Sequence, residues 1–258
     1  MPDATELAVK QMANREVFDN TFRLYKTGEL FDYIDYANTG NVTYKTTTVY
    51  ARGGHGGGRR MAFEGQPEAT MKLSTQIITP KLISMLSGTE VIKGANVFKH
   101  RVIASNTAET TTTITFPNGE TPIDSTLFIY PVGSDLNSEN KIAGTLNANV
   151  FNFTTPATED GDYDCFYETT IAEAQSVTFK GNVFPSDFIW DGETLWKDDD
   201  GSVRTEVFHA YRVHPQQNFT MNYQNTGDPG SLEITFDLLE NRQKQIFTKT
   251  FLPDDSGA

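Results

Sequence analysis

The segment from Arg52 to Arg60, RGGHGGGRR, has the composition of a loop that could cradle phosphate with its backbone amides. A phosphate loop needs GxxxxGK followed by Ser or Thr, and a dinucleotide loop needs GxGxxG between a strand and a helix. The segment fits neither pattern and lies between two strand patterns, so we do not expect it to bind a nucleotide. Two interpretations remain open: a flexible loop whose arginines contact an acidic neighbouring subunit, or a plain surface loop. The candidate inter-subunit residues are Arg52, Gly53, Gly54, His55, Gly56, Gly57, Gly58, Arg59 and Arg60.

Histidines and aspartates are the other residues that could do chemistry. His209 and His214 have opposite parity along an extended strand, so we expect them on opposite faces of a sheet. Asp198, Asp199 and Asp200 are consecutive, whereas a calcium loop alternates its ligands, so this segment is interpreted as a solvated hairpin turn. Neither an HExxH motif nor a GxSxG motif occurs. The sequence therefore predicts no catalytic residue, no bound metal and no cofactor.

Composition excludes several classes of protein. The chain has 258 residues and a net charge of −13, from 21 basic and 34 acidic residues, with a mean hydropathy of −0.44. Such an acidic chain is a poor candidate for gripping nucleic acid by its phosphates. One cysteine, Cys165, rules out a disulfide framework within the chain. The absence of a long apolar run and of a signal-peptide pattern predicts a protein made in a cytoplasm, without contact to a membrane.

The elements that position these residues read mainly as strands. The most regular stretch runs from Arg59 to Gly88, where Ala69, Met71, Leu73 and Ile77 alternate with polar residues and predict a half-buried strand. A short helix should follow. Thr79 can cap it and Pro80 suits its first position, Leu82, Ile83 and Leu86 give its apolar stripe, and Gly88 can end it.

The remaining strand patterns suggest a main β domain with an insertion. Residues 16–25, 30–37 and 42–51 read as a meander, and strands return from residue 166 onward. Short strands between residues 106 and 165 are typical of a small β-sandwich, and Tyr163 lies two residues before Cys165, as in the tyrosine corner of immunoglobulin-like domains. An immunoglobulin-like module and an elaborated loop of the main sheet both remain open. The expected division is 1–105 and 166–258 for the two parts of the main domain and 106–165 for the insertion.

Several stretches resemble the major tail tube protein of long-tailed bacteriophages, in particular phages of Gram-positive hosts. They cover more than half of the chain, at its two ends, and region 106–162 departs most. The similar stretches are REVFDNTFRLYKTGE, YIDYANTGNV, TVYARGGHGGGRRMAFEGQPEATMKLSTQIITPKLISMLSG, FPSDFIWDGETLWKDDDGSVRTEVFHAYRVHPQ and NTGDPGSLEITFDLL.

The resemblance implies a β-sandwich or half-barrel flanked by one short helix. It also implies that six copies form a ring, that rings stack into a hollow tube in the virion tail, and that the tube surrounds a tape measure protein. Double-stranded DNA would later pass through without tight binding. Further partners implied are tail initiator and terminator proteins and, in a contractile tail, a sheath.

Within this interpretation, Glu233 and Asp237 mark the polar face of a cleanly alternating strand that we expect to line the lumen. Two other classes of function remain open. One is another virion protein, such as a capsid decoration or a tail terminator. The other is a carbohydrate-acting enzyme or lectin, suggested by the aromatic residues Trp190, Trp196 and Tyr211 close to acidic residues.

Overall fold

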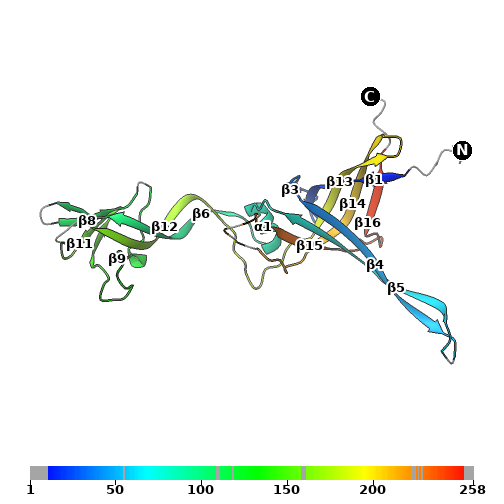
Figure 1. Cartoon of the computed structure of the whole chain (residues 1–258), viewed down its shortest axis with the longest axis horizontal. Helices are drawn as coiled ribbons and strands as arrows, with labels where there is room; N and C mark the ends of the chain where they lie inside the picture. Colours follow the sequence, from blue (N-terminus) through cyan, green and yellow to red (C-terminus); the bar gives the residue numbers. More distant parts are fainter. Residues whose placement is uncertain are drawn as a thin grey trace. The chain divides into compact units, whose positions relative to one another are not determined.

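A computed structural model shows a mainly β protein whose chain forms two compact units. Unit 1 comprises Met1–Glu90 and Val177–Ala258, and unit 2 comprises Val91–Ser176 (Figure 1). The expected insertion, 106–165, falls inside unit 2, which also takes in residues 91–105 and 166–176. The structure describes residues 11–54, 56–108, 111–117, 119–157, 161–221, 223, 225, 227 and 229–252.

Unit 1 is built on one antiparallel sheet of nine strands, with the order β3-β2-β13-β14-β15-β5-β4 and with β1 paired to β13 and β16 paired to β14. Its elements are β1 (Met12–Asn14), β2 (Asp19–Leu24), β3 (Leu30–Ile34), β4 (Thr39–Arg52), β5 (Arg59–Thr75), α1 (Pro80–Ser87), β13 (Phe188–Asp198), β14 (Val203–Pro215), β15 (Leu232–Leu238) and β16 (Phe247–Phe251).

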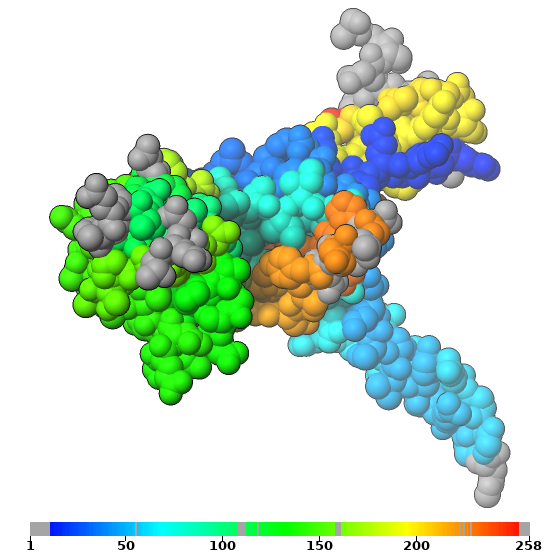
Figure 2. All heavy atoms as spheres, turned by 60° about the vertical axis from the view of Figure 1, so that its left-hand side comes forward, coloured from blue at the N-terminus to red at the C-terminus, as the bar shows by residue number. Residues whose placement is uncertain are grey.

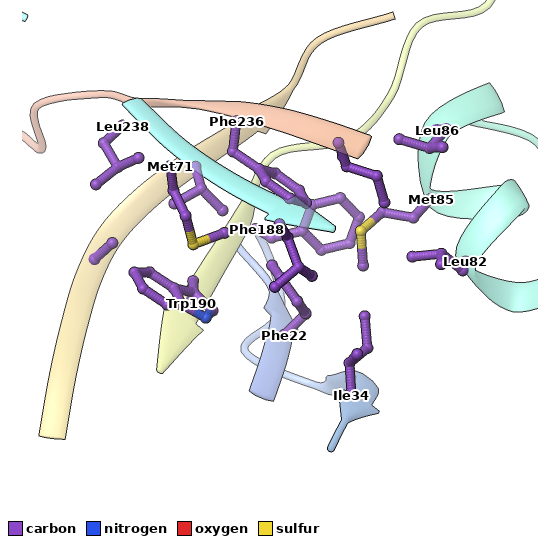
Figure 3. Packing of buried hydrophobic residues seen from close by; sticks show 14 of the residues in the cluster. Phe22, Ile34, Met71, Leu82, Met85, Leu86, Phe188, Trp190, Phe236 and Leu238 are labelled. Atoms are coloured by element: carbon purple, nitrogen blue, oxygen red, sulfur yellow. The ribbon is translucent and has the colours of Figure 1, made fainter. Parts of the chain in front are cut away.

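The sheet of unit 1 is strongly curved. Strands β2 and β15 are three positions apart in the sheet, which in a flat sheet would separate them by about 14 Å. Nevertheless the rings of Phe22 on β2 and Phe236 on β15 are stacked with centroids 5.3 Å apart. The core therefore fills the inside of the curve. Trp190 is fully buried in this core, and α1 contributes side chains to it (Figure 3). This arrangement confirms the predicted fold class.

The helix α1 forms where the sequence predicts it. The Thr79 hydroxyl accepts a hydrogen bond from the backbone N–H of Leu82 at 3.1 Å, and Pro80 occupies the first turn. Gly88 ends the helix with φ 72°, and a Cβ there would lie 2.3 Å from the carbonyl oxygen of Phe184. A side chain at position 88 is therefore excluded both by backbone conformation and by space.

The preceding strand ends earlier than the sequence predicts, before Ile77 and well short of Thr79. β5 ends at Thr75, whose hydroxyl accepts a hydrogen bond from the backbone N–H of Ile77 at 3.0 Å. This local turn takes the chain out of the sheet, so Ile77 is 54% exposed instead of buried.

Unit 2 contains two antiparallel sheets, one with the order β10-β11-β8-β7 and one with the order β6-β12-β9. Both sheets contribute to a single core around the fully buried Cys165 and Tyr167 of β12. Ile114 of β8, in the other sheet, belongs to this core, as does Phe116 just after β8. The unit is thus a small β-sandwich. Its elements are β6 (Ile92–Ala104), β7 (Asn106–Ala108), β8 (Thr111–Thr115), η1 (Asp124–Thr126), β9 (Phe128–Pro131), β10 (Gly144–Asn147), β11 (Val150–Phe153) and β12 (Asp162–Ser176).

Candidate assembly surface

Strands β4 and β5 continue beyond the sheet of unit 1 as a two-stranded ribbon. β15 pairs with β5 from Ala69 to Thr75, so that within the described residues 45–52 and 59–68 pair only with each other. Figures 1 and 2 show these segments, blue and cyan, projecting away from the rest of the sheet. We call residues 45–52 and 59–68 the ribbon.

A bulge marks the start of the ribbon. Thr46 pairs with Pro67 and Thr48 pairs with Glu64, so one residue of β4 faces two residues of β5. A Cβ on Gly65 would lie 2.4 Å from the Thr47 hydroxyl, which explains why glycine stands at this position. Bulges increase the local twist of a strand pair, and this one redirects the ribbon as it leaves the sheet.

One face of the ribbon is apolar and exposed. Val49 pairs with Phe63, and Ala51 pairs with Met61, so these four side chains share a face. Val49, Met61 and Phe63 are 67%, 60% and 58% exposed. Along β4 this face continues the side of the sheet away from the core, where the side chains are polar. Large apolar side chains gathered on an exposed strand pair indicate a surface that another molecule covers.

The predicted inter-subunit loop forms the tip of the ribbon. Arg52, the last residue of β4, pairs with Arg59, the first residue of β5, and the Arg59 guanidinium lies 4.2 Å from the centre of the Tyr50 ring. A Cβ on Gly57 would lie 2.2 Å from the Gly53 carbonyl oxygen, so this tight turn requires glycine. Gly56 has φ 72°, and His55 lies outside the described residues.

The two residues expected to line a lumen lie on the side of the sheet away from the core. Glu233 is exposed and forms an ion pair with Lys72 of the neighbouring strand at 2.8 Å. Asp237 is half-buried and accepts a hydrogen bond from the Gln216 side chain at 2.7 Å. The polar face is therefore present, although the ammonium group of Lys72 balances part of its negative charge.

The prediction that His209 and His214 lie on opposite faces of the sheet is wrong. β13 pairs Phe188 with Val213 and Trp190 with Ala210, which places one intervening residue on β13 opposite two on β14. This bulge restores both histidines to the side away from the core, since His209 and His214 each stand between two buried residues. A local insertion of this kind is invisible to a period-two pattern.

Both histidines belong to ion-paired clusters. Asp191 contacts His209 Nδ1 and Arg23 Nη2, each at 2.6 Å. Asp187 contacts His214 Nδ1 at 2.7 Å and Arg212 Nη2 at 2.6 Å.

Burial raises the pKa of Asp187, but hydrogen bonds from His214 and Arg212 outweigh burial, and the pKa is lowered overall. Each carboxylate thus has a charged partner beside its histidine, an arrangement that stabilises the sheet surface.

A third cluster, in unit 2, has no signal in the sequence. Glu120 is only 9% exposed and accepts hydrogen bonds from Lys99 Nζ and Arg101 Nη2, each at 2.6 Å, and from the Tyr167 hydroxyl. The bond from Arg101 is the main cause that lowers the pKa of Glu120 to about 2, against burial, which raises it. Lys99 and Arg101 lie two residues apart on β6 and so share a face of the strand. The loop that brings Glu120 to them is not predictable from local patterns.

None of these clusters is arranged as a metal site. In the described part of the chain, no group of three or more His, Cys, Asp or Glu side chains could hold a metal ion. Within the same residues, no helix has the length and apolar character needed to cross a membrane.

We predict that Glu120→Gln removes a pH-dependent part of the stability of unit 2. The folded pKa lies below the ordinary value of 4.5, so ionised Glu120 stabilises the fold above that pH and loses this contribution as the pH falls toward 2. The free energy of unfolding at pH 7 should fall by about 1 to 2 kcal/mol, because solvent screens part of the ion pairs. Urea unfolding at a series of pH values from 7 to 2 measures this free energy, and Glu139→Gln at an exposed position is the control. Equal pH profiles for the two variants would contradict a stabilising role for ionised Glu120.

Comparison with known proteins agrees with the fold. A family model described as the YomU/Tube protein family matches residues 14–250. No curated protein matches the chain. The family match confirms the resemblance to phage tail tube proteins and extends over unit 2 as well as unit 1. Because the match covers most of its length, the chain belongs to the YomU/Tube protein family.

Proposed function

We propose that the protein is the structural subunit of a phage tail tube, in which six copies form a ring and rings stack into a hollow conduit. The observation that carries this proposal is the apolar face of the ribbon, which stays exposed to solvent in a single chain. Burying a side chain the size of Val49 or Phe63 contributes about 1.5 to 3 kcal/mol. Covering a ribbon with several such residues by neighbouring copies would therefore release a substantial free energy of burial.

Open sheet edges support the same assembly. β3 and β4 are the two ends of the path through the sheet of unit 1, and among the described strands each has one partner. Unpaired strand edges expose backbone donors and acceptors that can pair with another chain. Pairing between copies would remove these edges and join the sheets of a ring into a continuous barrel.

The lumen in this proposal is lined by the polar side of the sheet, with Glu233 and Asp237 among its residues. An acidic wall repels the phosphates of double-stranded DNA, which favours passage over binding. The net charge of −13 per chain fits that role. A tape measure protein would fill the tube during assembly, initiator and terminator proteins would cap it, and the assembled tube would be part of the virion tail after synthesis in the host cytoplasm.

Unit 2 is proposed to be an elaboration of the subunit, an immunoglobulin-like module with four and three strands in its two sheets. Such a module also fits a capsid decoration or a tail terminator. The family match favours the tube over these alternatives, and labelling of virions with a specific antibody distinguishes shaft from head.

The carbohydrate alternative loses its central residue. Trp190 has no exposed surface, and its ring N–H donates a hydrogen bond to Asn20 at 3.0 Å. Trp196 donates to the buried Glu206 carboxylate. A buried indole ring cannot stack on a sugar, so Trp190 belongs to the core.

Electron microscopy of the concentrated protein should show rings or hollow tubes. In a map of the assembled tube, the side chains of Glu233 and Asp237 should point toward the axis. If these side chains point outward, the lumen assignment fails while the tube proposal stands. A protein that stays monomeric at every concentration, even with its initiator proteins, contradicts the tube proposal itself.

Replacing Val49 and Phe63 by Thr should impair assembly without unfolding the chain. Threonine suits a strand, and exposed positions change the free energy of unfolding by only about 0.5 kcal/mol. The critical concentration for assembly should rise at least about tenfold, because each 1.4 kcal/mol of lost contact is a factor of ten. Phe98→Thr, at a residue 57% exposed on β6, is the matched control and should assemble normally. Equal critical concentrations for the two variants would refute a role for the ribbon.

Deleting Gly53–Gly58 should weaken polymerisation more than folding. The deletion shortens the tip, while the core around Trp190 lies in the sheet and stays intact. Light scattering measures polymerisation, and tryptophan fluorescence during urea unfolding measures the stability of unit 1, which contains both tryptophans. Tubes of normal length from the deleted protein would rule out a contact role for the loop.

A further inference from the structure

The outward side of the sheet β6-β12-β9 in unit 2 carries a row of aromatic rings. On β12, Cys165 and Tyr167 belong to the core, so Phe166 between them faces outward. The register places His100 of β6 beside Phe166 on one side and Phe128 of β9 beside it on the other. Three rings, one from each strand, therefore lie on this outward side.

Two carboxylates flank the row. Asp164 and Glu168 lie two residues to either side of Phe166 on β12, so they share its side of the strand. Glu168 pairs with Phe98 of β6, which is 57% exposed, and Phe128 is 39% exposed. This surface, which we call the aromatic face, comprises Phe98, His100, Phe128, Asp164, Phe166 and Glu168.

The centre of the aromatic face is fixed by contacts within it. The rings of His100 and Phe166 are stacked with centroids 4.5 Å apart and planes 16° apart. His100 Nε2 also contacts Asp164 Oδ1 at 2.7 Å. Phe166 covers one side of the imidazole, yet the His100 side chain remains 51% exposed on β6, the edge strand of the sheet. A ligand would meet groups that are already ordered, which lowers the entropic cost of binding.

The aromatic face is too small to form a stable protein interface by itself. Neighbouring strands lie about 5 Å apart and each residue advances a strand by about 3.4 Å, so the face measures about 10 Å by about 14 Å between its outer residues. With the side chains around this outline it covers about 300 Å². A standard protein interface buries about 800 Å² on each partner, so a small ligand fits this surface better than a second copy of the chain.

The residue types of the aromatic face match the two sides of a sugar. The C–H groups on one side of a pyranose ring pack well on aromatic rings, whose π faces are negatively polarised. The hydroxyl groups around the ring donate and accept hydrogen bonds, and carboxylates and imidazole supply partners for them. The carboxylates also repel phosphates and other anions, which favours an uncharged saccharide.

We propose that the aromatic face of unit 2 binds an uncharged glycan. The exposed rings of Phe98 and His100 pack against C–H groups of sugar rings. Asp164 and Glu168 accept hydrogen bonds from sugar hydroxyls. The site lies in unit 2, whereas both tryptophans lie in unit 1. It adds a binding activity to the proposed tube function and does not depend on assembly.

Binding of the full chain to an array of immobilised neutral glycans tests the site. Isothermal titration with the oligosaccharide that binds best then gives the affinity. Phe98→Thr and Glu168→Ala should each weaken binding at least about tenfold, because each removes a direct contact to the sugar. Phe63→Thr is the matched control, since Phe63 is 58% exposed on a strand of unit 1, and its affinity should stay within about twofold of wild type.

Circular dichroism verifies that every variant is folded. Absence of binding to all neutral glycans overturns the proposal, and so does equal affinity of the Phe98→Thr and Phe63→Thr variants. An oligolysine peptide that binds the aromatic face when no neutral glycan does would assign the face to a basic partner and would also overturn the proposal. The titrations use unassembled protein, so these outcomes leave the tube function untouched.

Discussion

The burial of one face of β5 is the interaction on which unit 1 and its ribbon depend. Ala69, Met71 and Leu73 are almost fully buried between β4 and β15 and pack against the core. The same strand then continues into the ribbon, where it loses its second neighbour and its core contacts. A strand anchored at one end in a packed core can hold an exposed apolar ribbon that would not be stable as an isolated hairpin. The packed core of unit 1 thus supports the exposed apolar face of the ribbon.

The charges of the subunit are arranged in two ways. On the side of the sheet away from the core, many charges are paired, as in Lys72 with Glu233 and in the cluster of Asp191 with Arg23 and His209. Such pairs hold the sheet surface in a fixed arrangement and leave a modest field. The ribbon instead combines exposed apolar side chains with a cationic tip on a strongly acidic chain. In the proposed tube, the net charge would keep free copies apart while the ribbon attracts a neighbour locally.

Local signals made part of this structure predictable. Thr79, Pro80 and Gly88 define the helix α1, and the alternation of β15 fixes which of its residues face the core. Deviations arose where a local turn or bulge breaks a regular period, as at Ile77 and at the two histidines. The apolar face of the ribbon can be recognised only from the register of β4 against β5, because Val49 and Phe63 are separated in the sequence. The Glu120 cluster depends on contacts between distant segments, which no pattern in one sequence encodes.

Methionine oxidation measures most directly whether the ribbon is covered on assembly. Met61 is 60% exposed in the single chain, whereas Met71 and Met85 are 1% exposed and give the baseline for a buried methionine. Mass spectrometry after peroxide treatment follows each methionine separately in free and in assembled protein. The account predicts that the oxidation rate of Met61 falls toward that of the buried residues once tubes form. An unchanged rate for Met61 in assembled tubes would contradict it.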